Sequence, residues 1–206
     1  VSFPLGGVTV NLIDTPGHPD FIAEVERALA VLDGAVLVVS AVEGVQAQTL
    51  VLMRALRRLG IPTLLFVNKV DRRGADVERV LSEIRSRLGV AAVPLWAADP
   101  ERIAESEDSL LAVYLDGGDL DEALVESTRR GLVHPAFAGS ALTGDGVDAL
   151  ERAIARLLPA GSGDPDAPLD AAVFKVDRGQ HGEKIVYARL FAGTIRTRER
   201  IGEEKV

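Results

Sequence analysis

The chain has 206 residues, with 23 Lys and Arg against 31 Asp and Glu, which gives a formal net charge of −8. Hydrophobic residues make up 47% and charged residues 26%, which is typical of a globular protein with a real core and excludes a disordered or fibrous chain. Cysteine is absent, so disulfides and Cys-based zinc sites are excluded. The net negative charge disfavours nonspecific electrostatic binding of nucleic acid, and we expect no DNA partner.

The sequence also carries no sign of a membrane or secretory protein. No apolar run approaches the roughly 18 residues that a membrane helix needs, and no leader pattern opens the chain. We therefore expect no membrane partner and a cytoplasmic location.

Strand and helix patterns alternate through the first 160 residues. Short apolar or β-branched runs predict strands, and apolar residues at helical spacing predict helices. The expected strands are residues 8–13, 34–40, 63–67, 91–96 and 134–139, and the expected helices are residues 21–32, 46–59, 77–88 and 147–158. This alternation predicts an α/β fold with a mostly parallel sheet covered by helices on both faces.

Composition changes twice along the chain. The acidic stretch 99–131 is broken by two glycines and predicts an insertion with short helices at 109–115 and 120–129. Residues 161–168 are a linker by composition. After it the periodicity is two and predicts strands at residues 172–176, 184–192 and 194–201. Three strands cannot close a barrel, so we expect a sheet domain at 1–160 and the first strands of an all-β barrel domain at 169–206.

The run Asp14-Thr15-Pro16-Gly17-His18 follows the first predicted strand directly. A carboxylate at the end of a strand can hold Mg²⁺, usually through water, and the glycine lets a backbone N–H approach the terminal phosphate of a nucleotide. A simple boundary between a strand and a turn would leave a similar pattern. The nucleotide interpretation makes Asp14 the metal ligand.

Two further polar loops follow buried strands. In Asn68-Lys69-Val70-Asp71, the carboxylate suits guanine, because it accepts hydrogen bonds from N1–H and the exocyclic amine, a pair that adenine lacks. The Asn amide can bond the base and neighbouring loops, and the apolar stem of Lys69 can cover the base. The backbone of Ser140-Ala141-Leu142 could meet the guanine O6. A solvated polar loop is the alternative for the first of these runs.

Taken together, these three runs resemble the third, fourth and fifth nucleotide motifs of translation-factor GTPases. The histidine after the glycine is similar to that of the translational branch, where it positions the attacking water on the ribosome. Residues 19–35 resemble elongation factor G and its relatives. Residues 44–49, 144–150 and 173–193 look closer to the tetracycline-resistance ribosomal protection proteins, which are elongation-factor-G paralogues that dislodge the drug. The resemblance covers nearly the whole chain and is weakest at 99–131.

The resemblance implies a P-loop-type GTPase domain that uses GTP/GDP and Mg²⁺ and is triggered by the ribosome. It implies that His18 is catalytic and that guanine nucleotide is bound by Asp14, Thr15, Pro16, Gly17, His18, Asn68, Lys69, Val70, Asp71, Ser140, Ala141 and Leu142. The implied output is release of tetracycline from the ribosome. The alternatives are translocation, as in elongation factor G, and a non-catalytic ribosome-binding module.

One departure from the family pattern is large. No G-x-x-x-x-G-K-[ST] phosphate loop occurs in the sequence, and the switch threonine is also missing. In the family both precede the point where Val1 begins, so we interpret the chain as an internal fragment and expect the isolated fragment to be inactive. The strand that is missing lies centrally in the family's sheet, between the strands at Val8 and Gly34, which must then pair differently or leave a gap.

Two other features have ordinary interpretations. The stripe of Arg54, Arg57 and Arg58 could touch ribosomal RNA, but such stripes more often form a solvated helix face, which we favour. His134 and His181 have no partners nearby in sequence that would make a metal site, so we expect surface or structural roles.

Overall fold

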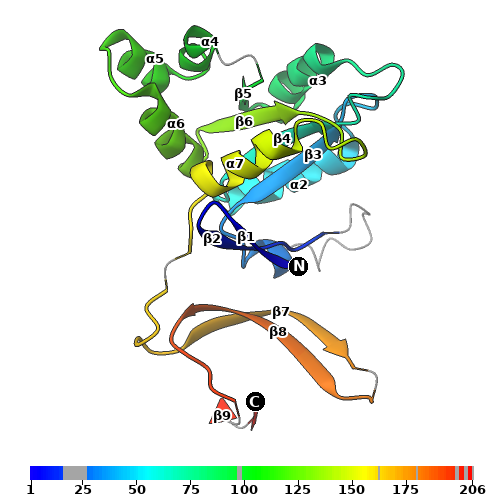
Figure 1. Cartoon of the computed structure of the whole chain (residues 1–206), viewed down its shortest axis with the longest axis vertical. Helices are drawn as coiled ribbons and strands as arrows, with labels where there is room; N and C mark the ends of the chain where they lie inside the picture. Colours follow the sequence, from blue (N-terminus) through cyan, green and yellow to red (C-terminus); the bar gives the residue numbers. More distant parts are fainter. Residues whose placement is uncertain are drawn as a thin grey trace. The chain divides into compact units, whose positions relative to one another are not determined.

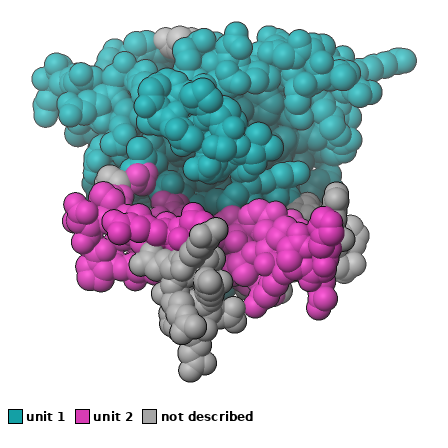
Figure 2. All heavy atoms as spheres, turned by 60° about the horizontal axis from the view of Figure 1, so that its bottom comes forward, with its two compact units in different colours: residues 1–20, 32–160 teal, residues 21–31, 161–206 magenta. Residues whose placement is uncertain are grey.

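The computed structural model describes residues 1–15, 27–96, 99–161, 163–179, 181–197, 200–201 and 204–205 (Figure 1). The chain divides into two compact units, residues 1–20 with 32–160 and residues 21–31 with 161–206 (Figure 2). The predictions for Pro16, Gly17 and His18, and for residues 21–26 of the helix expected at 21–32, lie outside the described residues, whereas residues 27–29 are helical as expected.

The first unit is built on a parallel sheet. In the described part of the chain, four strands pair in the order β3-β4-β6-β5, and every neighbouring pair is parallel. Their bounds are Ala35–Ser40 for β3, Thr63–Asn68 for β4, Val133–Ala138 for β6 and Ala91–Pro94 for β5. The predicted α/β fold with a mostly parallel sheet is confirmed.

Helices cover both faces of this sheet. Helices α2 (Ala47–Arg58) and α3 (Val77–Glu83) lie on one face, and α7 (Val147–Leu157) lies on the other (Figure 1). Side chains of β4 alternate between the two, so that Leu65 packs with α2 and α3 while Phe66 packs with α7. Burial on both faces explains why these strands appear as continuous apolar runs in the sequence.

The predicted insertion is helical. It contains α4 (Pro100–Ala104), α5 (Asp108–Leu115) and α6 (Leu120–Arg129), of which α4 was not predicted. Leu110 and Leu124 pack against strand residues to form a separate small core. Each helix begins at an acidic residue whose carboxylate accepts a backbone N–H of the first turn, which satisfies groups that the helix itself cannot. These residues are Asp99, Glu107 and Asp119.

The strand expected at 8–13 pairs outside the parallel sheet. Strand β2 (Val8–Asn11) is shorter than predicted and forms an antiparallel hairpin with β1 (Ser2–Leu5), which was not predicted. Among the described residues, β2 pairs with β1 and has no ladder with β3. A two-residue turn at Gly6-Gly7, both with positive φ, closes the hairpin and supplies β2 with backbone partners.

The helix predicted at 77–88 is present but changes its winding. It continues past α3 as a π-helical turn, Ile84–Leu88, and stops at Gly89, whose φ is 62°. Ile84 and Leu88 both stay buried in the core. No described helix is long and apolar enough to cross a membrane.

The second unit contains an antiparallel hairpin, β7 (Asp170–Arg178) and β8 (Lys184–Ala192). The strand predicted at 194–201 is wrong over residues 194–197, because only Arg200–Ile201 form a strand, β9, paired with β10 (Glu204–Lys205). The reason lies in the preceding linker: Gly193 N donates to Asp164 O at 2.9 Å, and Thr194 Oγ1 donates to Pro165 O at 2.9 Å. These bonds turn the chain away from the β8 ladder.

His134 lies inside the sheet and supports the structural interpretation. It is 3% exposed on β6, and its Nδ1 lies 3.2 Å from Thr63 O. Burial lowers the pKa of His134 below its ordinary value of 6.5; the carbonyl of Thr63 acts in the opposite direction, and the charge of Arg57 lowers the pKa further. The ring is therefore neutral in the folded protein near pH 7.

We predict that the free energy of unfolding falls as the pH drops below 6.5 because of His134. Below this pH the imidazole binds a proton in the unfolded chain more readily than in the folded chain. The free energy of unfolding then changes by at most about 1.4 kcal/mol per pH unit for one proton. Urea titrations between pH 7.5 and 5.5 measure it. His134→Gln should lose this component, whereas His181→Gln, at an exposed turn, should keep it. If the free energy of unfolding of His134→Gln depends on pH as in the wild type, another group binds the proton.

Candidate functional site

The predicted nucleotide residues gather at one edge of the sheet. Because β3, β4 and β6 are parallel, the loops that follow them emerge at the same carboxyl edge, where α/β proteins bind ligands. These loops are residues 41–46 after β3, 69–71 after β4 and 139–142 after β6, and Asn68 is the last residue of β4. The first of them was not predicted to belong to the site.

Asn68 joins two of the loops. Its Oδ1 accepts hydrogen bonds from Lys69 N at 2.8 Å and from Ala141 N at 3.0 Å. Backbone bonds reinforce this junction: Val70 N donates to Gly139 O at 3.2 Å, and Gly139 N donates to Val67 O at 3.0 Å. The structure thus brings together the two runs that the sequence predicted to bind the base, although they are about 70 positions apart in the chain.

Lys69 has an unusual backbone. Among the described residues it is the one non-glycine residue with a positive φ, at 70°. Such a conformation costs roughly 1–3 kcal/mol and persists where the surroundings impose it, often at functional sites. Its Nζ lies 3.5 Å from both carboxylate oxygens of Glu43, in the loop after β3. Glu43 was missed by the sequence analysis because it belongs to no motif and its partner is 26 residues away.

Asp71 has the acceptor groups that its predicted role requires. Its side chain is 24% exposed, and Oδ2 lies 3.7 Å from Nε of Arg72, which is itself 62% exposed. An ion pair of this length at the surface is weak and leaves the carboxylate available to a stronger partner. Val70, between Lys69 and Asp71, is partly buried and packs against the main core, which anchors the loop.

Hydrogen bonds within the loop after β6 fix its conformation. Ser140 is 1% exposed, and its N–H donates to Asp145 O at 2.9 Å while its Oγ accepts from Thr143 N at 3.3 Å. A Cβ at Gly139 would lie 2.1 Å from Asp145 O, so this close approach requires glycine. Leu142 is 76% exposed. Since Ala141 N–H already donates to Asn68, a guanine O6 at this loop would share or replace that bond.

An ionic cluster holds the loop after β3. Glu83 of α3 accepts from Val45 N at 3.0 Å and from the guanidinium of Arg79, and Arg87 lies 3.6 Å from the same carboxylate. The Val45 hydrogen bond is the largest cause that lowers the pKa of Glu83; desolvation opposes it, and Arg79 and Arg87 lower the pKa further. A Cβ at Gly44 would lie 2.4 Å from this carboxylate, so the loop can approach α3 only with glycine.

The first predicted motif is only partly described. Asp14 is exposed and Thr15 is partly buried; both follow β2, which is not part of the parallel sheet, and Pro16, Gly17 and His18 lie outside the described residues. In the described part of the chain, no group of three or more His, Asp or Glu side chains could hold a metal ion. One carboxylate still fits Mg²⁺, which usually takes one or two carboxylates and completes its shell with phosphates and water.

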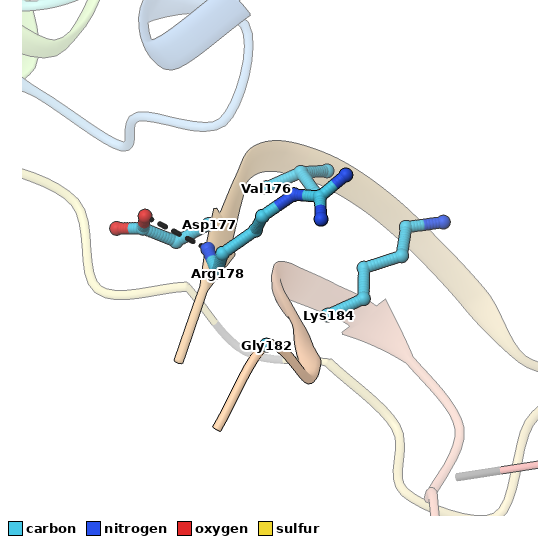
Figure 3. Close-up of a pocket in the computed structure, with 5 residues that line it drawn as sticks. All are labelled: Val176, Asp177, Arg178, Gly182 and Lys184. Carbon is cyan, nitrogen blue, oxygen red and sulfur yellow. Dashed lines mark hydrogen bonds between the residues drawn. The ribbon is translucent and has the colours of Figure 1, made fainter. Parts of the chain in front are cut away.

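A separate hollow lies at the end of the β7–β8 hairpin and contains none of the predicted nucleotide residues. This open hollow has a volume of about 600 Å³, and Figure 3 shows the residues that line it. These residues are Val176, Asp177, Arg178, Gly182 and Lys184. Arg178 and Lys184 are register partners across the hairpin, so two cationic residues line the hollow.

Comparison with known proteins identifies the family. The model of the elongation factor Tu GTP-binding domain matches residues 1–160, which are most of the chain. The chain belongs to the elongation factor Tu GTP-binding domain family. This match includes the three loops at the carboxyl edge of the sheet and confirms the predicted GTPase resemblance.

Several relatives of this chain are named as tetracycline or oxytetracycline resistance proteins. An oxytetracycline resistance protein of Streptomyces rimosus is 52% identical over the whole chain, and the tetracycline resistance protein TetM of Streptomyces lividans is 44% identical over 97% of it. Tetracycline resistance protein TetP of Clostridium perfringens is 37% identical over 98% of it. The chain spans about a third of the length of these relatives, 35 to 36%. The predicted similarity to tetracycline-resistance proteins is confirmed.

A solved structure supports the fold. A crystal structure of a Thermus thermophilus protein superposes with a TM-score of 0.81 at 28% sequence identity, and the match covers 96% of this chain and 37% of that one. The arrangement of elements is therefore one that a longer protein also adopts.

We predict that Asn68→Ala lowers the free energy of unfolding by about 1–2 kcal/mol, because two backbone N–H groups lose their shared acceptor. Asn68→Asp is the matched control: its carboxylate accepts both bonds and should keep the wild-type stability. Urea unfolding with fluorescence detection measures the difference. Equal stability of the Ala and Asp variants would show that Asn68 does not hold the two loops together.

Proposed function

We propose that the chain is part of a ribosome-dependent GTP hydrolase that releases tetracycline from the ribosome. The observation that carries the proposal is the Asn68 junction, which holds the predicted guanine-binding runs 68–71 and 139–142 side by side at the carboxyl edge of the sheet. The names of the relatives support an output in tetracycline resistance, and the family supports GTP as the nucleotide. An output at the ribosome also implies a cytoplasmic location.

In this proposal the residues have separate tasks. Asp71 accepts the N1–H and the exocyclic amine of guanine, and the stem of Lys69 covers the base. The backbone of Ser140, Ala141 and Leu142 meets the O6. Asp14 holds Mg²⁺ through water, and the metal would neutralise charge on the phosphates. His18 orients the attacking water, with Thr15, Pro16 and Gly17 shaping the loop beside the terminal phosphate.

The domain organisation is part of the same proposal. We infer a GTPase domain at 1–160 with an insertion at 99–131, a linker at 161–168, and the first strands of a barrel from 169 onward. The exposed apolar side chains of the β7–β8 hairpin support this, since Val173, Val176 and Val186 are each about half exposed and would be covered in a complete barrel. The isolated 206-residue chain has no phosphate-loop sequence, so we propose that it lacks the activity of the longer protein.

We predict that Asp71→Asn, in the longer protein, weakens binding of guanine nucleotides and favours xanthine nucleotides. The amide can donate a hydrogen bond to the 2-oxo group of xanthine, whereas the carboxylate repels that oxygen. Competition binding with GDP and xanthosine diphosphate measures the exchange of preference. Arg72→Gln, which removes the neighbouring ion-pair partner, should leave the preference for guanine intact. A full preference for GDP in Asp71→Asn contradicts the assignment of the base-binding residue.

We predict that His18→Ala nearly abolishes ribosome-stimulated GTP hydrolysis while nucleotide and ribosome binding stay nearly unchanged. Phosphoryl transfer depends on positioning and charge stabilisation, so loss of a group that orients water acts mainly on the transition state. Single-turnover hydrolysis on saturating ribosomes measures the rate. A wild-type rate in His18→Ala ends the catalytic assignment.

The same variant tests the biological output. Tetracycline-susceptible cells that express the longer protein should grow in the drug, and cells that express His18→Ala should not, at equal protein levels. Susceptibility of cells with the wild-type protein contradicts the proposed drug release.

A further inference from the structure

Glu43 bridges the loop after β3 and the predicted base-binding loop after β4. Both of its carboxylate oxygens lie 3.5 Å from Lys69 Nζ. The two side chains are about half exposed, 48% for Lys69 and 49% for Glu43, so the pair sits on the surface of the sheet edge. Among the described residues, this contact links the side chain of Lys69 to the loop after β3.

The carboxylate of Glu43 is itself held in place. Ser40, the last residue of β3, donates its hydroxyl hydrogen bond to Glu43, and the same Oγ accepts from Val42 N at 3.2 Å and from Glu43 N at 3.3 Å. The loop is further fixed through Val45 N and the Glu83 carboxylate. Because these bonds leave the Glu43 side chain few rotamers, its carboxylate can orient a charged partner.

Lys69 needs such an anchor on its side chain. Its backbone is fixed by a positive φ and by the bond from its N–H to Asn68, but four rotatable bonds separate the backbone from the ammonium group. A long cationic side chain at the surface otherwise samples many rotamers, and ordering it on binding costs free energy.

We propose that Glu43 is a positioning residue for guanine nucleotide binding: its carboxylate holds the Lys69 ammonium, so that the apolar stem of Lys69 is already ordered where the base is received. The inference rests on the proposed function and adds to it a residue from a loop with no nucleotide motif. Glu43 acts through Lys69 and has no contact of its own with the base.

The test is a double-mutant cycle on GDP binding in the longer protein, read with a fluorescent GDP analogue. Glu43→Gln should weaken binding about two- to fivefold, the range expected for a half-exposed ion pair. Lys69→Met keeps an apolar stem without the charge, and in that background Glu43→Gln should have no further effect. The effect of Glu43→Gln should also shrink at 1 M salt, where screening acts over roughly 3 Å.

The matched control is Asp121→Asn. Asp121 forms a 2.8 Å ion pair with Arg156 at the surface of the same unit, and its replacement changes the net charge by the same amount. It should leave GDP binding unchanged, which separates positioning from general charge repulsion.

The outcomes are distinct. Wild-type affinity in Glu43→Gln, tighter binding in Glu43→Gln, or an equal loss in the Lys69→Met background overturns the positioning role while leaving the proposed function standing. Absence of GDP binding by the wild-type longer protein overturns both. Weakened binding that depends on Lys69 and on salt supports the inference.

Discussion

A single carboxamide oxygen organises the predicted site. Asn68 Oδ1 accepts from both Lys69 and Ala141, so it joins loops that leave two neighbouring parallel strands. The parallel sheet brings the loops to one edge but does not fix their separation, because backbone ladders end where the strands end. The bonds to Asn68 set that separation together with the two backbone bonds of Gly139 to Val67 and Val70.

The same junction sustains the strained backbone at Lys69. A positive φ at a lysine is unfavourable on its own, so the residues on either side must hold it. Asn68 does so through the Lys69 N–H, and Val70 does so through Gly139 O and its packing against the core. Strand β4 beneath is fully buried over Thr63–Leu65 and at Val67, which gives these bonds a rigid base. The strained backbone of Lys69 therefore directly follows a buried strand.

The sequence predicted what depends on local patterns. Continuous apolar runs gave β3, β4 and β6 to within about a residue, and the polar runs that follow them identified the loops now found at one edge. The short β1–β2 hairpin and the five-residue helix α4 were not foreseen, and the turn after Gly193 depends on a distant contact with Asp164 that leaves no pattern in the sequence. The Glu43–Lys69 contact was also invisible, because an exposed glutamate in a loop looks the same whether or not it has a distant partner.

Recognition of a base, the role proposed for these loops, places a demand on the structure. A site that reads hydrogen-bond donors must be ordered before the ligand arrives, since freezing flexible side chains on binding weakens affinity. The loops on the parallel sheet meet this demand through bonds between backbone, Asn68 and the ionic cluster of Glu83.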